Sequence, residues 1–597
     1  MAEDRGGKSA PNQGCRGSGL SGLSGMPGTA DGHDVLTIQD AMGRVRFIRA
    51  FPGQTLSQML FLEGLWPTRP FCSGLGKCGL CLVFVADASD AGAASPRDHA
   101  GGTPTPDEMA ALSPEELEQG GRLACRCPAV GGMTVRLPFA FPSSVAEERA
   151  IPLSRPATGS LSLAVDLGTT GLDWLVRDDG GVLAQGRELN PQLAAGSEVM
   201  SRLGFALMAE ANARMLRDVV VRRLHDLVMS MPTAVDRICV AGNTVMTALL
   251  LDWPLQNLAV APYRRSHPGG FWTTLPFQAC STGEQSRSCA SNCAGIDGGR
   301  IGSGRTYIPP QPAPFIGGDV SAGLAAIQFG HAGQPVYPFL LADLGTNGEF
   351  ILALGPEHYL AASVPMGPAL EGIGMSCGSA ALPGVWVDVA VTPLGLRPRS
   401  LPMLERDAPH TLSQPPDRQR ISGTGYLALL AGLLRLGVLK RSGGFADGQS
   451  PLARNIGANV ADVHGERRLV LGADVFLTGR DVEEVLKVKA AFNLAMSRLL
   501  AEAGLTPGGI RAFYLAGALG EHVDLSALEE LGFVPPGSRE RMRPVGNTAL
   551  AGAALLVASS QARNWIEEMA PRITTLPIGQ EPDFFAHYTQ RLVFRHV

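Results

Sequence analysis

The order of apolar and polar residues near the N-terminus predicts two strands followed by a helix. Residues 35–39 and 44–49 alternate apolar and polar side chains, as half-buried strands do. Residues 54–64 repeat apolar side chains at helical spacing. Ser113 precedes Pro and Glu at capping-box spacing and predicts a further helix start, and a strand follows at residues 133–137.

A second pattern, a buried strand leading through a glycine turn into another strand, occurs twice. Residues 161–176 read Leu-Ser-Leu-Ala-Val-Asp-Leu-Gly-Thr-Thr-Gly-Leu-Asp-Trp-Leu-Val, and residues 339–352 read Phe-Leu-Leu-Ala-Asp-Leu-Gly-Thr-Asn-Gly-Glu-Phe-Ile-Leu. One such hairpin is weak evidence, because similar turns close many hairpins. Two copies at domain spacing predict two related lobes that face each other.

Three further segments carry glycine turns at the ends of expected elements. Residues 513–522 pass from an apolar strand into a glycine turn, and residues 240–246 pass from a strand into Gly-Asn-Thr. Residues 545–554 begin a helix after Val-Gly-Asn. The chain contains no Gly-x4-Gly-Lys-Ser/Thr motif, so a phosphate site of the P-loop kind is excluded.

Composition adds that the chain is globular and has several domains. Its 597 residues exceed what one core usually holds, and 45% of them are hydrophobic. The net charge of -5 gives no basic excess, so nucleic acid is not an expected partner.

The first 33 residues are rich in Gly and Ser and contain no continuous apolar stretch. We therefore expect a disordered tail and not a secretory signal. The longest apolar run, residues 548–558, is too short to span a bilayer and suits a buried helix. A cytoplasmic protein without membrane contact is the prediction.

The cysteines indicate a metal centre near the N-terminus. Cys72, Cys78 and Cys81 follow the pattern Cys-x5-Cys-x2-Cys, and further Cys lie at Cys125 and Cys127. The glycines between the first three permit the turns and close approach that an iron-sulfur cluster needs. A structural zinc site is the alternative, but zinc sites usually pair two short Cys-x2-Cys units and one is present here.

Three isolated cysteines are best explained as ordinary thiols: Cys15, Cys239 and Cys377. Cys280, Cys289 and Cys293 lie in or beside a Ser- and Gly-rich stretch that predicts a flexible insertion at residues 281–305. A second metal site there is the less favoured alternative.

The cysteine pattern resembles that of the plant and vertebrate-type 2Fe-2S ferredoxins with five residues between the first two ligands. In that family the fourth ligand lies in a Leu-x-Cys segment like the one ending at Cys125. The resemblance covers about residues 34–140 and implies a β-grasp fold. It also implies that Cys72, Cys78, Cys81 and Cys125 hold the cluster and that Cys127 is spare.

The paired hairpins can serve phosphate chemistry. Small residues in each turn can bring N–H groups to a phosphate, and an Asp at the strand end can hold Mg²⁺ or its water. Together with the three glycine-turn segments they resemble the actin, sugar kinase and heat-shock ATPase superfamily over about residues 161–558. That resemblance implies an ATP site. Its catalytic residues are Asp166 and Asp343, its phosphate-binding residues are Gly168, Thr169, Thr170, Gly345, Thr346 and Asn347, and Gly517, Ala518 and Gly520 line the adenosine.

These expectations combine into one architecture. An α+β β-grasp ferredoxin domain precedes an α/β actin-like ATPase made of two related ribonuclease-H-like lobes. The predicted parts are a disordered tail at 1–33, the 2Fe-2S ferredoxin domain at 34–140, a linker at 141–160, ATPase lobe I at 161–335 and ATPase lobe II at 336–597.

The order of a 2Fe-2S domain and an actin-like ATPase resembles that of the reductive activators of corrinoid proteins. Further similarity lies in residues 315–320, 367–378 and 486–492. The family implies ATP-dependent transfer of one electron from the cluster to cob(II)alamin on a corrinoid protein or corrinoid methyltransferase, with a low-potential electron donor upstream. The loop at 367–378 is the candidate contact with that partner, and a structural glycine loop is the alternative.

One departure from the family pattern concerns the middle of the chain. About twenty residues separate the ferredoxin pattern from the first hairpin. The extra middle domain of some family members is therefore expected to be missing or reduced, which leaves a homodimer open.

Two other functions remain open at this point. An activator of 2-hydroxyacyl-CoA dehydratases would carry a 4Fe-4S cluster between two subunits and would not need the ferredoxin pattern. A redox-sensing nucleotide-binding protein would use the same cluster and ATP site without delivering an electron uphill.

Overall fold

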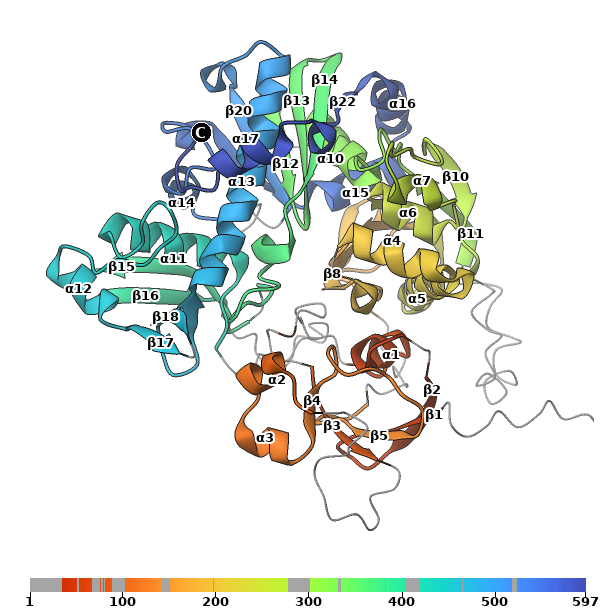
Figure 1. Ribbon diagram of the computed structural model, residues 1–597. Helices are drawn as coiled ribbons and strands as arrows, with labels where there is room; N and C mark the ends of the chain where they lie inside the picture. Colours follow the sequence, from red (N-terminus) through yellow and green to blue (C-terminus); the bar gives the residue numbers. More distant parts are fainter. Residues whose placement is uncertain are drawn as a thin grey trace, which may run out of the picture.

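The computed structural model describes residues 35–50, 53–66, 76, 79, 81–87, 103–141, 151–196, 198–277, 301–330, 334–381, 383–402, 419–463, 465–517 and 523–597. Figure 1 shows an N-terminal part in red and orange beneath two larger lobes, one yellow to green and one green to blue. The expected tail at 1–33, residues 281–300 of the expected insertion and the cysteines at 280, 289 and 293 lie outside the described residues. Residues 301–305 belong to a strand, Ile301–Ile308, so the expectation of a flexible insertion is wrong there.

The N-terminal part is a five-stranded sheet in the order β2-β1-β5-β3-β4. Leu36 and Ile38 are fully buried on one face of β1, as the alternation predicts. Ser113 and Glu116 form the predicted capping box, in which the Glu116 carboxylate accepts from the Ser113 N–H at 2.7 Å. The elements are β1 Val35–Gln39, β2 Val45–Arg49, α1 Leu56–Leu62, β3 Leu82–Asp87, α2 Pro106–Ala111, α3 Pro114–Glu118, β4 Gly121–Leu123 and β5 Met133–Arg136.

The first lobe is built on a six-stranded sheet in the order β10-β11-β9-β6-β7-β8. Strands β6, β7 and β8 form an antiparallel meander, and β9 pairs with β6 in parallel. Its elements are β6 Leu161–Leu167, β7 Gly171–Asp178, β8 Gly181–Leu189, η2 Leu193–Ala195, α4 Val199–Met208, α5 Glu210–Met229, β9 Val235–Gly242, α6 Thr244–Leu250, α7 Gln256–Ala259, β10 Phe271–Thr274, β11 Ile301–Ile308 and α10 Gly318–Phe329.

The second lobe repeats this arrangement, which confirms the two related lobes predicted from the repeated hairpin. Its sheet runs β21-β20-β12-β13-β14-β22, with a meander of β12, β13 and β14 and a parallel partner, β20, beside β12. The elements are β12 Phe339–Leu344, β13 Asn347–Gly355, β14 His358–Pro365, η5 Pro368–Glu371, α13 Gly479–Glu502, β20 Ala512–Gly517, α14 Leu525–Glu530, β21 Met542–Gly546, α15 Thr548–Ala558, α16 Ser560–Met569, β22 Thr574–Leu576 and α17 Phe584–Gln590.

Between β14 and α13 the second lobe carries a two-stranded sheet that packs on α11 and a three-stranded sheet that contacts α13, seen in teal in Figure 1. The elements are β15 Trp386–Thr392, β16 Gly395–Ser400, α11 Gly423–Leu436, α12 Pro451–Gly457, β17 Val460–Val463, β18 Glu466–Val470 and β19 Phe476–Thr478.

Helices α10 and α15 cross where the two lobes meet. A Cβ atom added at Gly552 would lie 1.9 Å from the carbonyl oxygen of Ala322, so glycine lets the two backbones approach. Helix α15 occupies residues 548–558 and is largely buried, as its apolar run predicts. Within the described part of the chain, no helix is both long and apolar enough to cross a membrane.

Candidate functional site

The turns of the two hairpins meet over one cavity. The hydroxyl oxygens of Thr170 and Thr346 lie 3.0 Å apart, which joins the β6–β7 turn to the β12–β13 turn. The cavity holds about 280 Å³. Its wall includes the predicted residues Asp166, Gly168, Thr169, Thr170, Asp343, Gly345, Thr346, Asn347 and Gly517. Ala518 and Gly520 lie outside the described residues.

Each hairpin presents two carboxylates at equivalent positions. Asp166 pairs with Asp173 across the first hairpin, and Asp343 pairs with Glu349 across the second. Asp319, in the first turn of α10, lines the same cavity. Like charges directly opposite each other destabilise a sheet, so their presence in both hairpins indicates a role that needs negative charge.

Burial and neighbouring carboxylates raise the pKa of four of these groups. Burial raises the pKa of Asp343 to about 6 and that of Asp319 to about 7, and the Asp343 charge adds to the Asp319 shift. Burial also raises the pKa of Asp166 and of Glu349 well above the usual range, with neighbouring carboxylates adding to both. A cation in the cavity would favour the ionised forms instead.

A bound cation here would need ligands beyond the protein. Among the described residues, no group of three or more His, Cys, Asp or Glu side chains is placed to hold a metal ion. Mg²⁺ commonly takes one or two carboxylates together with water and substrate phosphates. The cavity chemistry therefore fits magnesium that arrives with a polyphosphate, with Asp166 and Asp343 as the candidate carboxylates.

Buried amides fix the first turn. Asn190 donates from Nδ2 to the carbonyl oxygen of Gly168 at 2.6 Å, and its N–H donates to the carbonyl oxygen of Thr170 at 2.8 Å. Asn243 donates to the Thr169 hydroxyl at 3.0 Å while its own oxygen caps α6. These contacts set one backbone conformation for the turn.

Glu371 supports the second turn. Its carboxylate accepts from the Thr346 N–H at 3.0 Å and from the Thr346 hydroxyl at 3.3 Å. A Cβ atom at Gly345 would lie 3.2 Å from the same carboxylate. Glu371 belongs to the loop at 367–378, so part of the loop expected to meet a partner instead serves the cavity.

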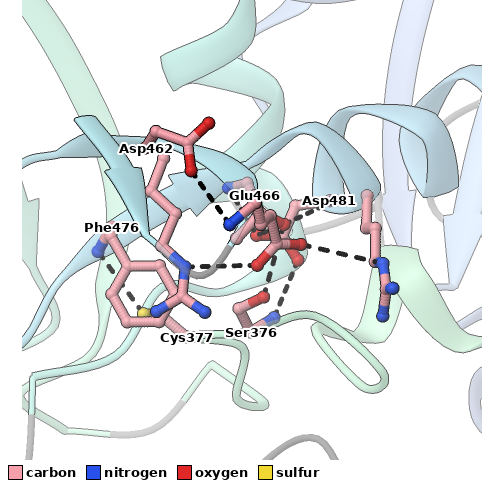
Figure 2. A network of polar contacts seen from close by, with 10 residues as sticks. Ser376, Cys377, Asp462, Glu466, Phe476 and Asp481 are labelled. Atoms are coloured by element: carbon pink, nitrogen blue, oxygen red, sulfur yellow. Dashed lines mark hydrogen bonds and ion pairs between the residues drawn. The ribbon is translucent and has the colours of Figure 1, made fainter. Parts of the chain in front are cut away.

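The end of that loop packs into the second lobe. Ser376 donates its N–H to Asp481 at 2.7 Å, and the Cys377 sulfur accepts from the Phe476 N–H at 3.5 Å (Figure 2). Cys377 is buried and its N–H donates to the Tyr426 hydroxyl at 3.1 Å. These contacts favour the structural alternative for residues 376–378.

Asn547, at the start of α15, links the two carboxylates of the first hairpin. Its Nδ2 donates to Asp166 at 2.8 Å and to Asp173 at 2.8 Å, and its Oδ1 caps α15. Helix α15 is therefore tied directly to the cavity.

Several of these residues were not predicted as site residues from the sequence. Strand alternation could have found Asp173 and Glu349, because both lie opposite a predicted Asp in its hairpin. Four others lie in segments that the sequence analysis singled out without assigning them a role: Asn243, Asp319, Glu371 and Asn547. Asn190 lies in none of those segments and depends on tertiary contacts alone. The full set is Asp173, Asn190, Asn243, Asp319, Glu349, Glu371 and Asn547.

Two of the four predicted cluster ligands are described and lie together. The sulfur atoms of Cys81 and Cys125 are 3.3 Å apart, well beyond a disulfide bond of about 2.05 Å. Gly76 and Gly79 in the same loop have φ angles of 71° and 67°, as the sequence anticipated for close turns. Cys72 and Cys78 lie outside the described residues.

Cys127, predicted to be spare, is also buried in this part. Burial raises the pKa of its thiol to about 11, with the Glu108 charge adding to the shift, so the thiol form is strongly favoured.

The duplicated lobes, their facing hairpins and the shared cavity define an ATPase-like fold of the actin, sugar kinase and heat-shock class. Two family models agree: one described as the C-terminal domain of RACo, the ASKHA domain, matches residues 338–597, and one described as the RACo middle region matches residues 161–273. The predicted actin-like fold is thus confirmed. The expectation that the middle region is missing or reduced is wrong, because that region is the first lobe itself.

The chain belongs to the family of reductive activators of corrinoid proteins. It is 26% identical over 474 residues to the corrinoid activation enzyme RamQ of Eubacterium limosum, covering 74% of this chain and 72% of that protein. It is 26% identical over 435 residues to a [Co(II) methylated amine-specific corrinoid protein] reductase of Methanosarcina barkeri, covering 69% and 72%. A solved reductive activator for a corrinoid, iron-sulfur protein shares the fold, with a TM-score of 0.61, 20% identity and coverage of 94% and 98%.

Proposed function

We propose that this protein uses ATP to drive one electron from a 2Fe-2S cluster to cob(II)alamin on a corrinoid methyl-transfer protein, restoring cob(I)alamin. The observation that carries the proposal is the meeting of both predicted phosphate turns over one carboxylate-lined cavity, in a chain that also brings two predicted cluster cysteines together. The named activities of the relatives support the choice of a corrinoid partner.

ATP with magnesium fits the cavity between the hairpins. The turn residues Gly168, Thr169, Gly345 and Thr346 line it at the point where the lobes meet. In this proposal Asp166 and Asp343 hold the metal and orient the attacking water, and the ionised carboxylates are neutralised by the incoming cation.

A 2Fe-2S cluster fits the N-terminal part. Cys81 and Cys125 offer two sulfurs without a disulfide, and Gly76 in the same loop has a φ of 71°, a backbone conformation that favours glycine. When bound, the cluster supplies a one-electron carrier whose potential in ferredoxins of this type is about -400 mV. Cys72 and Cys78 would complete the ligand set.

The transfer is expected to be uphill, which gives ATP its role. A ligand shifts an equilibrium only by its differential affinity for the two states. In this proposal the ATP-bound and ADP-bound lobes differ in affinity for the corrinoid partner, and hydrolysis releases the reactivated partner. A low-potential donor returns the electron to the N-terminal part.

Anaerobic visible spectroscopy tests the proposal. The reconstituted protein is mixed with a cob(II)alamin-loaded methyltransferase subunit and Ti(III) citrate, with and without magnesium ATP. We expect cob(I)alamin to form only with ATP and to be absent with the Asp343→Asn and Cys81→Ser variants, while Arg214→Gln, which changes an exposed residue of α5, behaves as the native protein does.

Two other outcomes would separate the alternatives. Cluster reduction without reduction of any corrinoid partner would favour the redox-sensing function. An absorbance spectrum without the multiple visible bands of an oxidised 2Fe-2S centre would favour a 4Fe-4S activator.

A further inference from the structure

Arg202, in α4, is a fully buried cation behind the first phosphate turn. Its side chain is 0% exposed, and the hydrogen-bond partners that the structure gives its guanidinium are uncharged. Burial lowers its pKa to about 9, and the Glu371 charge partly opposes that shift. Burying a charge lowers the stability of the folded state unless hydrogen bonds compensate it, so the contacts of Arg202 need an explanation.

Three oxygen atoms and the Met246 sulfur, which lies 3.0 Å from Nη1, accept from the guanidinium. It donates to the carbonyl oxygen of Thr169 in the phosphate turn. It also donates to Gln192 Oε1 at 3.4 Å and to the carbonyl oxygen of Gly196 at 3.0 Å. Gln192 and Gly196 are the N-cap and C-cap residues of η2, so Arg202 holds both ends of this short helix and the turn together.

The N-terminal part rests on the same short helix. Helix α1 contacts η2, and Figure 1 shows α1 on the side of the N-terminal part that faces the first lobe. The Leu62 side chain of α1 is buried in the core of the first lobe, together with Ala195 of η2. Burial raises the pKa of the adjacent Glu63, and Arg222 of α5 opposes that shift across the contact.

We infer that Arg202 is a positioning residue that couples docking of the N-terminal part to nucleotide binding at the first phosphate turn. The inference rests on the proposed ATP site. It adds the contacts through which nucleotide binding at that site would affect the docking of the N-terminal part. The path is Leu62 to η2, η2 to the guanidinium, and the guanidinium to Thr169.

The physical basis is that one planar group holds three oxygens at fixed positions. Movement of the turn onto a phosphate shifts the oxygen of Thr169, and the guanidinium transmits that shift to Gln192 and Gly196. Thermodynamic coupling is reciprocal, so an undocked α1 loosens η2 and weakens nucleotide binding by the same factor that nucleotide strengthens docking. The buried positive charge behind the turn also attracts the phosphates.

Titration calorimetry with magnesium and adenylyl imidodiphosphate, on the full chain with its cluster, tests the coupling. Arg202→Lys keeps the charge but cannot reach three oxygens at once, and we expect it to weaken binding about tenfold. Leu62→Ala removes a side chain that packs on the first lobe and not in the N-terminal core, and we expect it to weaken binding about threefold. Arg214→Gln on α5 is the matched control and leaves affinity unchanged.

The double variant decides between coupling and two local effects. Coupling predicts that Leu62→Ala adds almost nothing once Arg202 is Lys. Fully additive losses, or native affinity in a folded Arg202→Lys protein, would overturn the inference. Absence of nucleotide binding by the native protein would overturn the proposed function as well, so the two failures are distinguishable.

Hydrogen exchange gives a readout that a structural role alone would not change. In the native protein the nucleotide analogue is expected to slow exchange in α1, and in Arg202→Lys this effect disappears while the melting temperature is retained. If Arg202→Lys does not fold, Leu62→Ala must still abolish the nucleotide-dependent protection of α1. Unchanged exchange of α1 on adding nucleotide to the native protein would refute the coupling.

Discussion

At the residue scale, burying several carboxyl groups in one cavity lowers the stability of the folded protein. Asp343 stands opposite Glu349 in a buried hairpin and shares the cavity with Asp319. Burial raises the pKa of both aspartates, so each binds its proton more tightly in the folded chain than in the unfolded chain. Such groups lower stability as the pH rises through their folded-state pKa.

Replacing one of these carboxylates by an amide is therefore expected to stabilise the nucleotide-free protein. The pKa of Asp343 is about 6 against 3.8 for an ordinary Asp, so the folded state loses stability between about pH 4 and pH 6. Asp343→Asn removes that loss and should raise the free energy of unfolding at pH 7.5 by about 1–3 kcal/mol. ATP hydrolysis should be lost in the same variant. Thermal unfolding at pH 4.5 and pH 7.5 measures the first effect.

The pH dependence supplies the control. At pH 4.5 Asp343 is protonated in the folded state but already largely ionised in the unfolded state, so the difference between the two proteins should fall to about a third of its value at pH 7.5. An equal stabilisation at both pH values would mean that packing and not charge is responsible.

A matched pair of cysteine variants tests the cluster assignment. Cys125 lies 3.3 Å from Cys81, whereas Cys127 is a buried thiol whose pKa is raised to about 11. Cys125→Ser should abolish the 2Fe-2S absorbance and remove about half or more of the bound iron. Cys127→Ser should retain both the absorbance and the iron. Iron analysis and visible spectra after anaerobic reconstitution measure the outcome. Cluster loss in Cys127→Ser alone would exchange the two assignments.

At the element scale, the crossing of α10 and α15 controls how the lobes meet. Gly552 of α15 touches the backbone of Ala322, where a Cβ atom would lie 1.9 Å from its carbonyl oxygen. Gly552→Ala should lower stability by about 1–3 kcal/mol, because the helices must separate. Gly204, in α4, has nothing within 4 Å of an added Cβ, so Gly204→Ala should raise stability by about 0.5–1 kcal/mol. Chemical denaturation compares the pair, and destabilisation by both variants would contradict this explanation.

Many of the elements could be predicted from the sequence, whereas some contacts of the site could not. Three features were predictable, because each depends on a local pattern of apolar, glycine or capping residues. They are the repeated hairpins, the helix at 548–558 and the capping box at Ser113. Arg202 and Asn190 were not predictable. Their partners are backbone oxygens brought close by the fold, and no periodicity of the chain signals such contacts.

At the scale of the whole molecule, the two lobes are joined by more than the chain. The Thr170 and Thr346 hydroxyls meet across the cavity, and Asn547 of α15 holds Asp166 and Asp173 of the first lobe. A ligand bound between the lobes would therefore act on all of these contacts at once. Binding only to the folded state stabilises it by mass action.

This stabilisation should depend on pH in a definite direction. The pKa of Asp343 is about 6 and that of Asp319 about 7, so both are largely protonated at pH 5.5 and must release protons before magnesium nucleotide is held. The rise in melting temperature on adding magnesium adenylyl imidodiphosphate should therefore be smaller at pH 5.5 than at pH 8. The terminal phosphate of the nucleotide also titrates at about pH 6, and its ionisation changes the stabilisation in the same direction.

The Asp319→Asn variant separates the contribution of the protein's carboxylates to this pH dependence from the contribution of the nucleotide phosphate. In this variant one of the titrating cavity carboxylates is absent, so the pH dependence of the stabilisation should become weaker while the phosphate contribution stays. Differential scanning calorimetry at matched ionic strength provides the comparison. A native protein whose stabilisation by the nucleotide is the same at both pH values would show that the cavity carboxylates do not face the bound cation, and the assignment of Asp343 as a magnesium residue would then have to be abandoned.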